Sequence, residues 1–174
     1  MIQVPKVDLL QIYGEKGLTL TFNVPNPEHF LEDVSCAGLK GEALKEAKRK
    51  PFVTTINLAV LIDFEKQTYY LEIPNGYRWN GANVPAFAWA IIGQRTDPRF
   101  KLASCLHDYM CEHHNAIRNN RYLSTLIFTT CCDYFGQFPK WKLFAMKHCV
   151  DNYQKIWGKD LKGKKFTFNS SIFS

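Results

Sequence analysis

Two segments that lie close together in the sequence carry the side chains best suited to chemistry. The first is Asn80-Gly81-Ala82-Asn83-Val84-Pro85, and the second runs from Ala103 to Tyr109 and contains His107 and Asp108. An imidazole beside a carboxylate is the pair that a general base and its orienting partner require. Two consecutive helical residues point about 100° apart, so one of them can face the core edge while the other faces solvent or the preceding loop.

The same helix offers a second kind of site, a metal centre. Cys111 and His114 follow His107 at spacings of four and seven residues and share its helical face. A single helix cannot surround a tetrahedral ion, so residues from elsewhere would have to complete the shell. We therefore expect no cofactor, and we keep a divalent metal bound at His107, Asp108, Cys111 and His114 as the alternative.

The first segment has a structural explanation beside the chemical one. Asparagine tolerates left-handed backbone angles and glycine adopts them freely, and side-chain amides both donate and accept hydrogen bonds. We interpret the segment as a clasp in which Asn80 and Asn83 hold the helix that carries His107. In the enzymatic alternative, the two amides position a substrate, His107 acts as a base or metal ligand, and Asp108 orients it or binds the ion.

The two segments together resemble the phage- and prophage-borne domain of unknown function 1353. Members of that family carry an Asp-Gly-Ala-Ser-Ile/Val-Pro box, an apolar stretch with Trp and Gly, and a helix with Ala and His-Asp-Tyr. The resemblance covers about residues 55–158, and it implies candidate binding residues at Asn80, Gly81, Asn83, Pro85, Tyr109 and Arg121. The matching positions here are Asn80–Pro85, Trp89, Gly93, Ala103, His107–Tyr109, and then Arg121, Ser124, Thr125 and Phe128 in a second family helix.

The sequence departs from the family pattern where charge would matter. Asn80 and Asn83 stand where the family has Asp and Ser, and Thr125 stands where it has a second-helix Asp. A metal-assisted or acid–base hydrolase needs several convergent carboxylates or imidazoles. The resemblance therefore implies a phage-type structural or accessory interaction protein, a virion or assembly component, built on a non-catalytic domain. A hydrolase that uses His107 and Asp108 is the alternative.

The elements that must position these residues follow from hydrophobic periodicity. Strand patterns fill the first half and helix patterns the second, which predicts one α+β domain over residues 1–158, an antiparallel sheet packed by three helices. Strands are expected at 18–24, 53–64 and 68–73, and a solvated helix at 41–50. The three helices are predicted to begin at Thr96 or Asp97, at Asn119 or Asn120, and at Pro139. The second helix is expected to bury Leu123, Leu126, Ile127, Cys131 and Tyr134 and to stop at Gly136.

A basic, phenylalanine-rich arm follows at residues 159–174. Apolar side chains of this size carry about 2 kcal/mol of burial free energy each, so we expect them to pack on this domain or on another protein subunit. The residues concerned are Phe166, Phe168, Ile172 and Phe173. An anionic partner at Lys159–Lys165 is a further alternative. Weak nucleic-acid binding there or at the 45–50 helix ranks third, because neither cluster has interleaved exposed aromatic rings.

Composition limits the classes of protein to which the chain could belong. The chain has 174 residues, 46% of them hydrophobic, and a net charge of +6, which excludes wholesale disorder and favours anionic partners without identifying one. No apolar run reaches the roughly 18 residues of a membrane helix. Residues 1–8 lack the pattern of a signal peptide, so we expect a chain in the cytoplasm of a host cell or in a virion. The six cysteines are expected to be free thiols.

Overall fold

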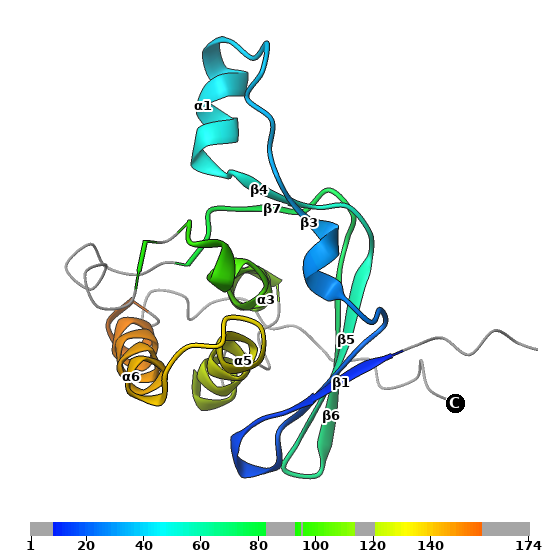
Figure 1. Cartoon of the computed structure of the whole chain (residues 1–174), viewed down its shortest axis with the longest axis vertical. Coiled ribbons are helices and arrows are strands. Elements are labelled where there is room, and N and C mark those ends of the chain that lie inside the picture. Colours follow the sequence, from blue (N-terminus) through cyan, green and yellow to red (C-terminus); the bar gives the residue numbers. More distant parts are fainter. Residues whose placement is uncertain (1–8, 83–92, 95, 114–120, 158–174) are drawn as a thin grey trace, which may run out of the picture.

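The computed structural model describes residues 9–82, 93, 94, 96–113 and 121–157. It has the predicted α+β architecture, with antiparallel strands first and helices after them (Figure 1). A four-stranded sheet has the order β1-β2-β5-β6 and a three-stranded sheet the order β3-β4-β7. The strands are β1 (Leu10–Tyr13), β2 (Thr19–Phe22), β3 (Leu31–Asp33), β4 (Phe52–Thr54), β5 (Leu58–Phe64), β6 (Gln67–Ile73) and β7 (Arg78–Trp79), and the helices are α1 (Gly41–Arg49), α3 (Lys101–His113), α5 (Arg121–Tyr134) and α6 (Lys140–Trp157).

The predicted hairpin is present, but its first strand is shorter than expected. β5 buries every second residue and pairs with β6 from Leu58 opposite Ile73 to Phe64 opposite Gln67. The expected strand at 53–64 is divided, because β4 ends at Thr54 and belongs to the other sheet. The Thr54 hydroxyl donates to the Pro74 carbonyl at 2.7 Å and accepts from the backbone N–H of Tyr77 at 3.0 Å. These two bonds tie the end of β4 to the turn between β6 and β7, next to the strand with which β4 pairs.

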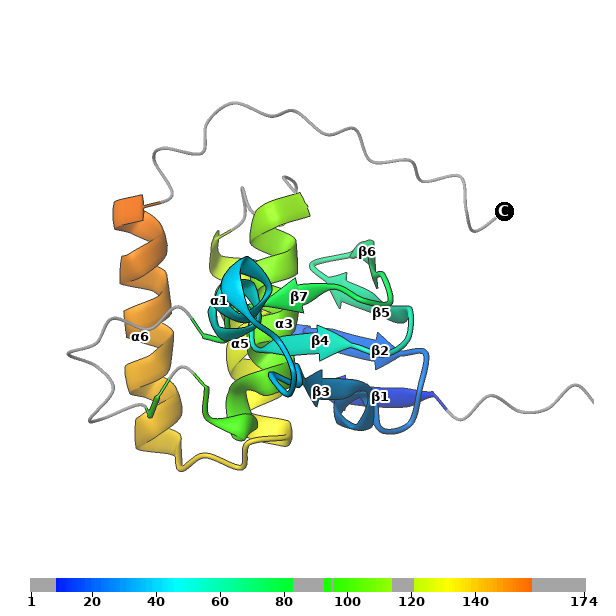
Figure 2. The same ribbon diagram turned by 90° about the horizontal axis from the view of Figure 1, so that it is seen from above.

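The helices form layers against the sheets. Helices α3 and α5 pack together beside the sheets, and α6 packs on α5 at the far side (Figure 2). Helix α1 was predicted at this position and stands apart from the other helices at the top of Figure 1. None of the helices in the described part of the chain combines the length and the apolar character needed to span a bilayer.

The predicted core of the second helix is correct with one exception. In α5, Leu123, Leu126, Ile127 and Cys131 are buried as expected, but Tyr134 is exposed. The chain turns after Tyr134, and Phe135 takes the core position, with its ring edge-on to Phe22 at 6.0 Å. Asp97 is confirmed as the cap that precedes α3, because its carboxylate accepts the backbone N–H of Arg99 at 3.0 Å. All six cysteines are free, and Cys105, Cys131 and Cys132 are buried.

The turn after β1 depends on a glycine. The backbone of Gly14 lies against α5 so closely that a Cβ there would overlap Thr130 Oγ1 and lie 3.2 Å from Leu18 Cδ2. We expect Gly14→Ala to lower the free energy of unfolding by about 1–3 kcal/mol, since the β-branched Thr130 side chain is restricted at χ1 and both of its branches lie close to the new Cβ. Urea unfolding measures this. In a Thr130→Ala background the same change should cost much less, and equal costs in both backgrounds would disprove the clash.

Candidate functional site

The segment that contains β7 crosses one face of α3 and is bound to it by side-chain hydrogen bonds. Trp79 Nε1 donates to Ser104 Oγ at 3.0 Å, and the Tyr77 hydroxyl donates to Glu112 Oε2 at 3.1 Å. Ser104 and Glu112 lie on the same face of the helix as Asp108, each four residues from it. The three-stranded sheet is thereby tied to α3 on both sides of Asp108.

Asn80 supplies the bond to Asp108. With the amide oriented so that its nitrogen faces the acceptors around it, Asn80 donates to Asp108 Oδ2 and to the Gly81 carbonyl, both at 3.0 Å. Gly81 has a φ of 86°, a left-handed angle that favours glycine. This loop therefore clasps α3 through Asn80, and the acceptor is Asp108. The other two candidate binding residues of the box, Asn83 and Pro85, lie outside the described residues.

His107 is as enclosed as its neighbour. We expected one member of the pair to face the core edge and the other to face solvent or the loop; His107 faces α5 and Asp108 faces the loop, and their side chains are only 12% and 8% exposed. The reason is that two different neighbours cover them. The Asn80 loop covers Asp108, and the ring of Phe128 from α5 packs edge-on to the imidazole at 5.8 Å. His107 Nδ1 lies 3.7 Å from Asp108 Oδ1.

The electrostatics favour an ion pair at this position. Burial raises the pKa of Asp108, and the contact with His107 opposes that effect. Burial alone would lower the pKa of His107, but the interactions with Cys111 and with the hydrogen-bonded Asp108 outweigh it and raise the pKa to about 10. The imidazole is therefore protonated at neutral pH. A protonated imidazole cannot accept a proton, so in this state His107 is unsuited to act as a general base.

The third candidate ligand, Cys111, is near His107 but poorly aligned with it. Its Sγ lies 3.9 Å from both ring nitrogens, whereas a thiol that donates a proton in line approaches one nitrogen much more closely than the other. Among the described residues, no three His, Cys, Asp or Glu side chains are grouped so that they could hold a metal ion. The fourth candidate ligand, His114, lies outside the part of the chain that the structure describes.

Of the remaining candidates, Tyr109 has a contact at this junction. The Tyr109 ring is half-buried and lies edge-on to Tyr77, with 4.9 Å between the ring centres. Arg121 begins α5. Thr125, where the resembled family has an acid, is buried in α5.

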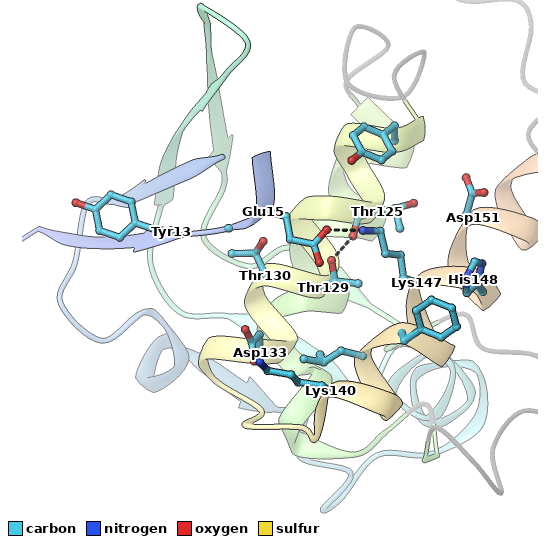
Figure 3. Close-up of a pocket in the computed structure, with 14 residues that line it drawn as sticks. Tyr13, Glu15, Thr125, Thr129, Thr130, Asp133, Lys140, Lys147, His148 and Asp151 are labelled. Atoms are coloured by element: carbon cyan, nitrogen blue, oxygen red, sulfur yellow. Dashed lines mark hydrogen bonds and ion pairs between the residues drawn. The ribbon is translucent and has the colours of Figure 1, made fainter. Parts of the chain in front are cut away.

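An open cavity lies elsewhere, and the sequence interpretation missed it. It has a volume of about 820 Å³ and lies between the turn after β1, α5 and α6 (Figure 3). His107, Asp108 and Asn80 are not among its lining residues. A signal was present in the sequence, because a helix that packs between two layers normally has an apolar face toward each of them. The α5 face toward α6 instead carries Tyr122, Thr125, Thr129 and Asp133.

The stability of the protein is expected to depend on pH through His107. A folded-state pKa of about 10, above the ordinary 6.5, stabilises the fold fully below pH 6.5, and this contribution is lost as the pH rises through 10. Between pH 7 and pH 10 the Tm should fall by about 5 °C more in the natural protein than in His107→Gln, which carries no titrating group there. Calorimetry of both proteins measures the difference. Parallel curves would show that His107 is neutral in the fold.

Comparison with known proteins places the junction inside a family. Residues 57–146 match the family described as a protein of unknown function (DUF1353). A stretch of 94 residues is 30% identical to the uncharacterized protein y4jT of Sinorhizobium fredii (strain NBRC 101917 / NGR234) and covers 52% of this chain. The match spans 26% of that protein, about a quarter of its length. No solved structure matches the chain.

Proposed function

The chain belongs to the DUF1353 family of proteins of unknown function, and we propose that it is a phage-type structural or accessory interaction protein built on a non-catalytic domain. The observation that carries this proposal is the set of side-chain hydrogen bonds between residues 77–80 and α3. They use the polar atoms of Asn80 and Asp108 to join two parts of the fold. Groups engaged in this way contribute to the stability of a scaffold.

The chemistry of the junction supports a scaffold over a hydrolase. Catalysis by acid and base needs one group that gives a proton and another that takes it, with substrate access to both. Here His107 is protonated and enclosed, Asp108 accepts from Asn80, and Thr125 supplies no charge. The junction thus joins the loop to α3 by hydrogen bonds, and His107 and Asp108 form an ion pair there.

The test is whether the chain is a component of a particle. The gene, expressed with its own neighbours, should yield assemblies in which mass spectrometry finds the chain in a fixed ratio to the major subunits. Genes for capsid or tail proteins beside it would agree with this result. Absence from purified particles, together with lysis genes as neighbours, would contradict the proposal.

A hydrolase remains the second candidate, because His107 Nδ1 lies 3.7 Å from Asp108 Oδ1 and 3.9 Å from Cys111 Sγ on the same helix. This candidate predicts stoichiometric zinc, manganese or iron in the purified protein, lost in His107→Ala. A control is Trp79→Phe, which loses the bond to Ser104 and leaves the three side chains in place. Metal content that is lost in the first variant and kept in the second would favour the hydrolase.

We also propose that the arm at 159–174 contacts other protein subunits through Phe166, Phe168, Ile172 and Phe173, residues that lie outside the described part of the chain. An anionic partner at Lys159–Lys165 is the competing hypothesis. Truncation after Gly158 should abolish incorporation into assemblies and leave the Tm of the domain unchanged. A lowered Tm would show instead that the arm belongs to the core of this domain. Lysine-to-glutamine changes that alone abolish binding would favour the anionic partner.

A further inference from the structure

We propose that the cavity between α5, α6 and the turn after β1 is a binding site for a neutral glycan. This inference rests on the proposed binding role of the protein and adds to it the chemical class of a partner. The cavity has a volume of about 820 Å³, which lies within the range of about 300–1,000 Å³ that is usual for sites that take small ligands. Three chain segments form it, at residues 13–15, 122–133 and 140–151.

Exposed aromatic rings supply the apolar part of the site. Phe144 lines the cavity and is 65% exposed, and the ring of His148 lies edge-on to it with 4.3 Å between the ring centres. Tyr122 lines the cavity from α5. Flat apolar rings that face an open cavity suit a ligand that has one apolar face, and a pyranose ring presents such a face through its C–H bonds. Tyr13 also lines the cavity, but its ring points away from the helices (Figure 3).

The charges that line the cavity balance one another. Asp133 and Lys140 lie at one end of the cavity, and His148 and Asp151 lie at its other end (Figure 3). Between the two ends, Lys147 bridges to Glu15 at 2.5 Å. Three carboxylates thus face two ammonium groups and one imidazole. Since no single sign dominates, the field favours a ligand that is polar but uncharged. The carboxylates accept from hydroxyl groups and the ammonium groups donate to oxygen atoms, and a sugar offers both partners.

One buried polar group in the wall makes no hydrogen bond within the described part of the chain. Thr130 is 7% exposed and lines the cavity. Its neighbour Thr129 donates to the carbonyls of Thr125 and Leu126, but no such bond exists for the Thr130 hydroxyl. A buried hydroxyl without a partner is costly. A ligand hydroxyl at the cavity wall would satisfy it, which is the second independent reason to infer a hydroxyl-bearing ligand.

Nucleic acid is the competing ligand class. Single-stranded nucleic acids stack their bases on aromatic rings and need a groove of positive charge for the phosphates. The rings are present, and Lys16 lies over the Tyr122 ring at 5.1 Å. However, the carboxylates of Asp133 and Asp151 lie in the cavity itself, where phosphate groups would be repelled. The glycan is therefore the better match to the charges on this surface.

Titration of the full isotope-labelled chain with chitotriose, cellotriose and maltotriose tests the proposal by amide chemical-shift changes. At least one trisaccharide should shift the amides of α5 and α6 that line the cavity. Phe144→Ala should weaken that binding about tenfold, and Thr130→Val, which keeps the shape and removes the hydroxyl, about fivefold. The matched control is Trp141→Ala, because Trp141 is 63% exposed on the same helix but does not line the cavity.

The outcomes separate the possibilities. Binding weakened by the two cavity variants and unchanged in the control supports the glycan site. No binding of any trisaccharide, or equal weakening by all three variants, overturns it. Tighter binding of oligothymidylate, competed by salt, would assign the surface to nucleic acid and also overturn it. None of these results depends on incorporation into particles, so the proposed function and this inference can fail separately.

Discussion

Replacing Asp108 by alanine is expected to lower the free energy of unfolding by about 3–5 kcal/mol, as is usual when one partner of a buried ion pair is removed. The change leaves the protonated imidazole of His107 without its counter-charge and the Asn80 amide without its acceptor. The imidazole is largely enclosed, so water cannot readily replace its lost counter-charge, and Asn80 keeps only the Gly81 carbonyl as an acceptor. Chemical denaturation measures the loss. Proton NMR should show the pKa of His107 falling from about 10 toward or below its ordinary value.

The matched control is Glu112→Ala, one turn along the same face of α3. Glu112 accepts from the Tyr77 hydroxyl at 3.1 Å, but its side chain is partly exposed, so its loss should cost about 1 kcal/mol or less. An Asp108→Ala loss as small as this would mean that the pair is hydrated. The clasp would then contribute little to the fold, and the scaffold interpretation would lose its main support.

The order and type of the elements could be predicted because they depend on local patterns. Alternating burial along β5, the cap at Asp97 and the apolar stripes of α3, α5 and α6 are all properties of neighbouring residues. The division of the 53–64 segment could not be predicted in this way. It depends on Thr54 bonding to Pro74 and Tyr77, twenty or more residues away, and nothing within the segment itself marks the break.

The candidate site was predictable to a similar extent. The two chemical segments and the clasp between them followed from residue types and from the family resemblance, whereas the burial of both His107 and Asp108 depends on Phe128 from another helix. The cavity is formed by three segments that are distant in the sequence. No local sequence pattern predicts that these segments lie close together in the fold. The polar stripe on α5 at Tyr122, Thr125, Thr129 and Asp133 indicates an incompletely buried face, but it does not reveal which element lies opposite.

Asn80→Asp is the second change with a large expected effect, because it restores the residue that the resembled family has at this position. The new carboxylate would face Asp108 at the present hydrogen-bond distance of 3.0 Å, removing a donor and adding a like charge. At neutral pH we expect a loss of about 3 kcal/mol in the free energy of unfolding. Two adjacent carboxylates share a proton when acidified, so most of the loss should disappear near pH 4. Denaturation at both pH values measures this.

Asn75→Asp is the control, since Asn75 is exposed in a turn and the added charge there should change stability by less than about 0.5 kcal/mol. The scaffold interpretation expects Asn80→Asp to remain destabilised at neutral pH when magnesium, manganese or zinc is added, because one helix and one loop provide too few ligands. A divalent ion that raises the Tm of Asn80→Asp by several degrees, and leaves the Tm of the natural protein unchanged, would contradict the scaffold interpretation. The junction would then be a metal site from which Asn80 has removed one ligand, and the hydrolase would become the ancestral function of this position.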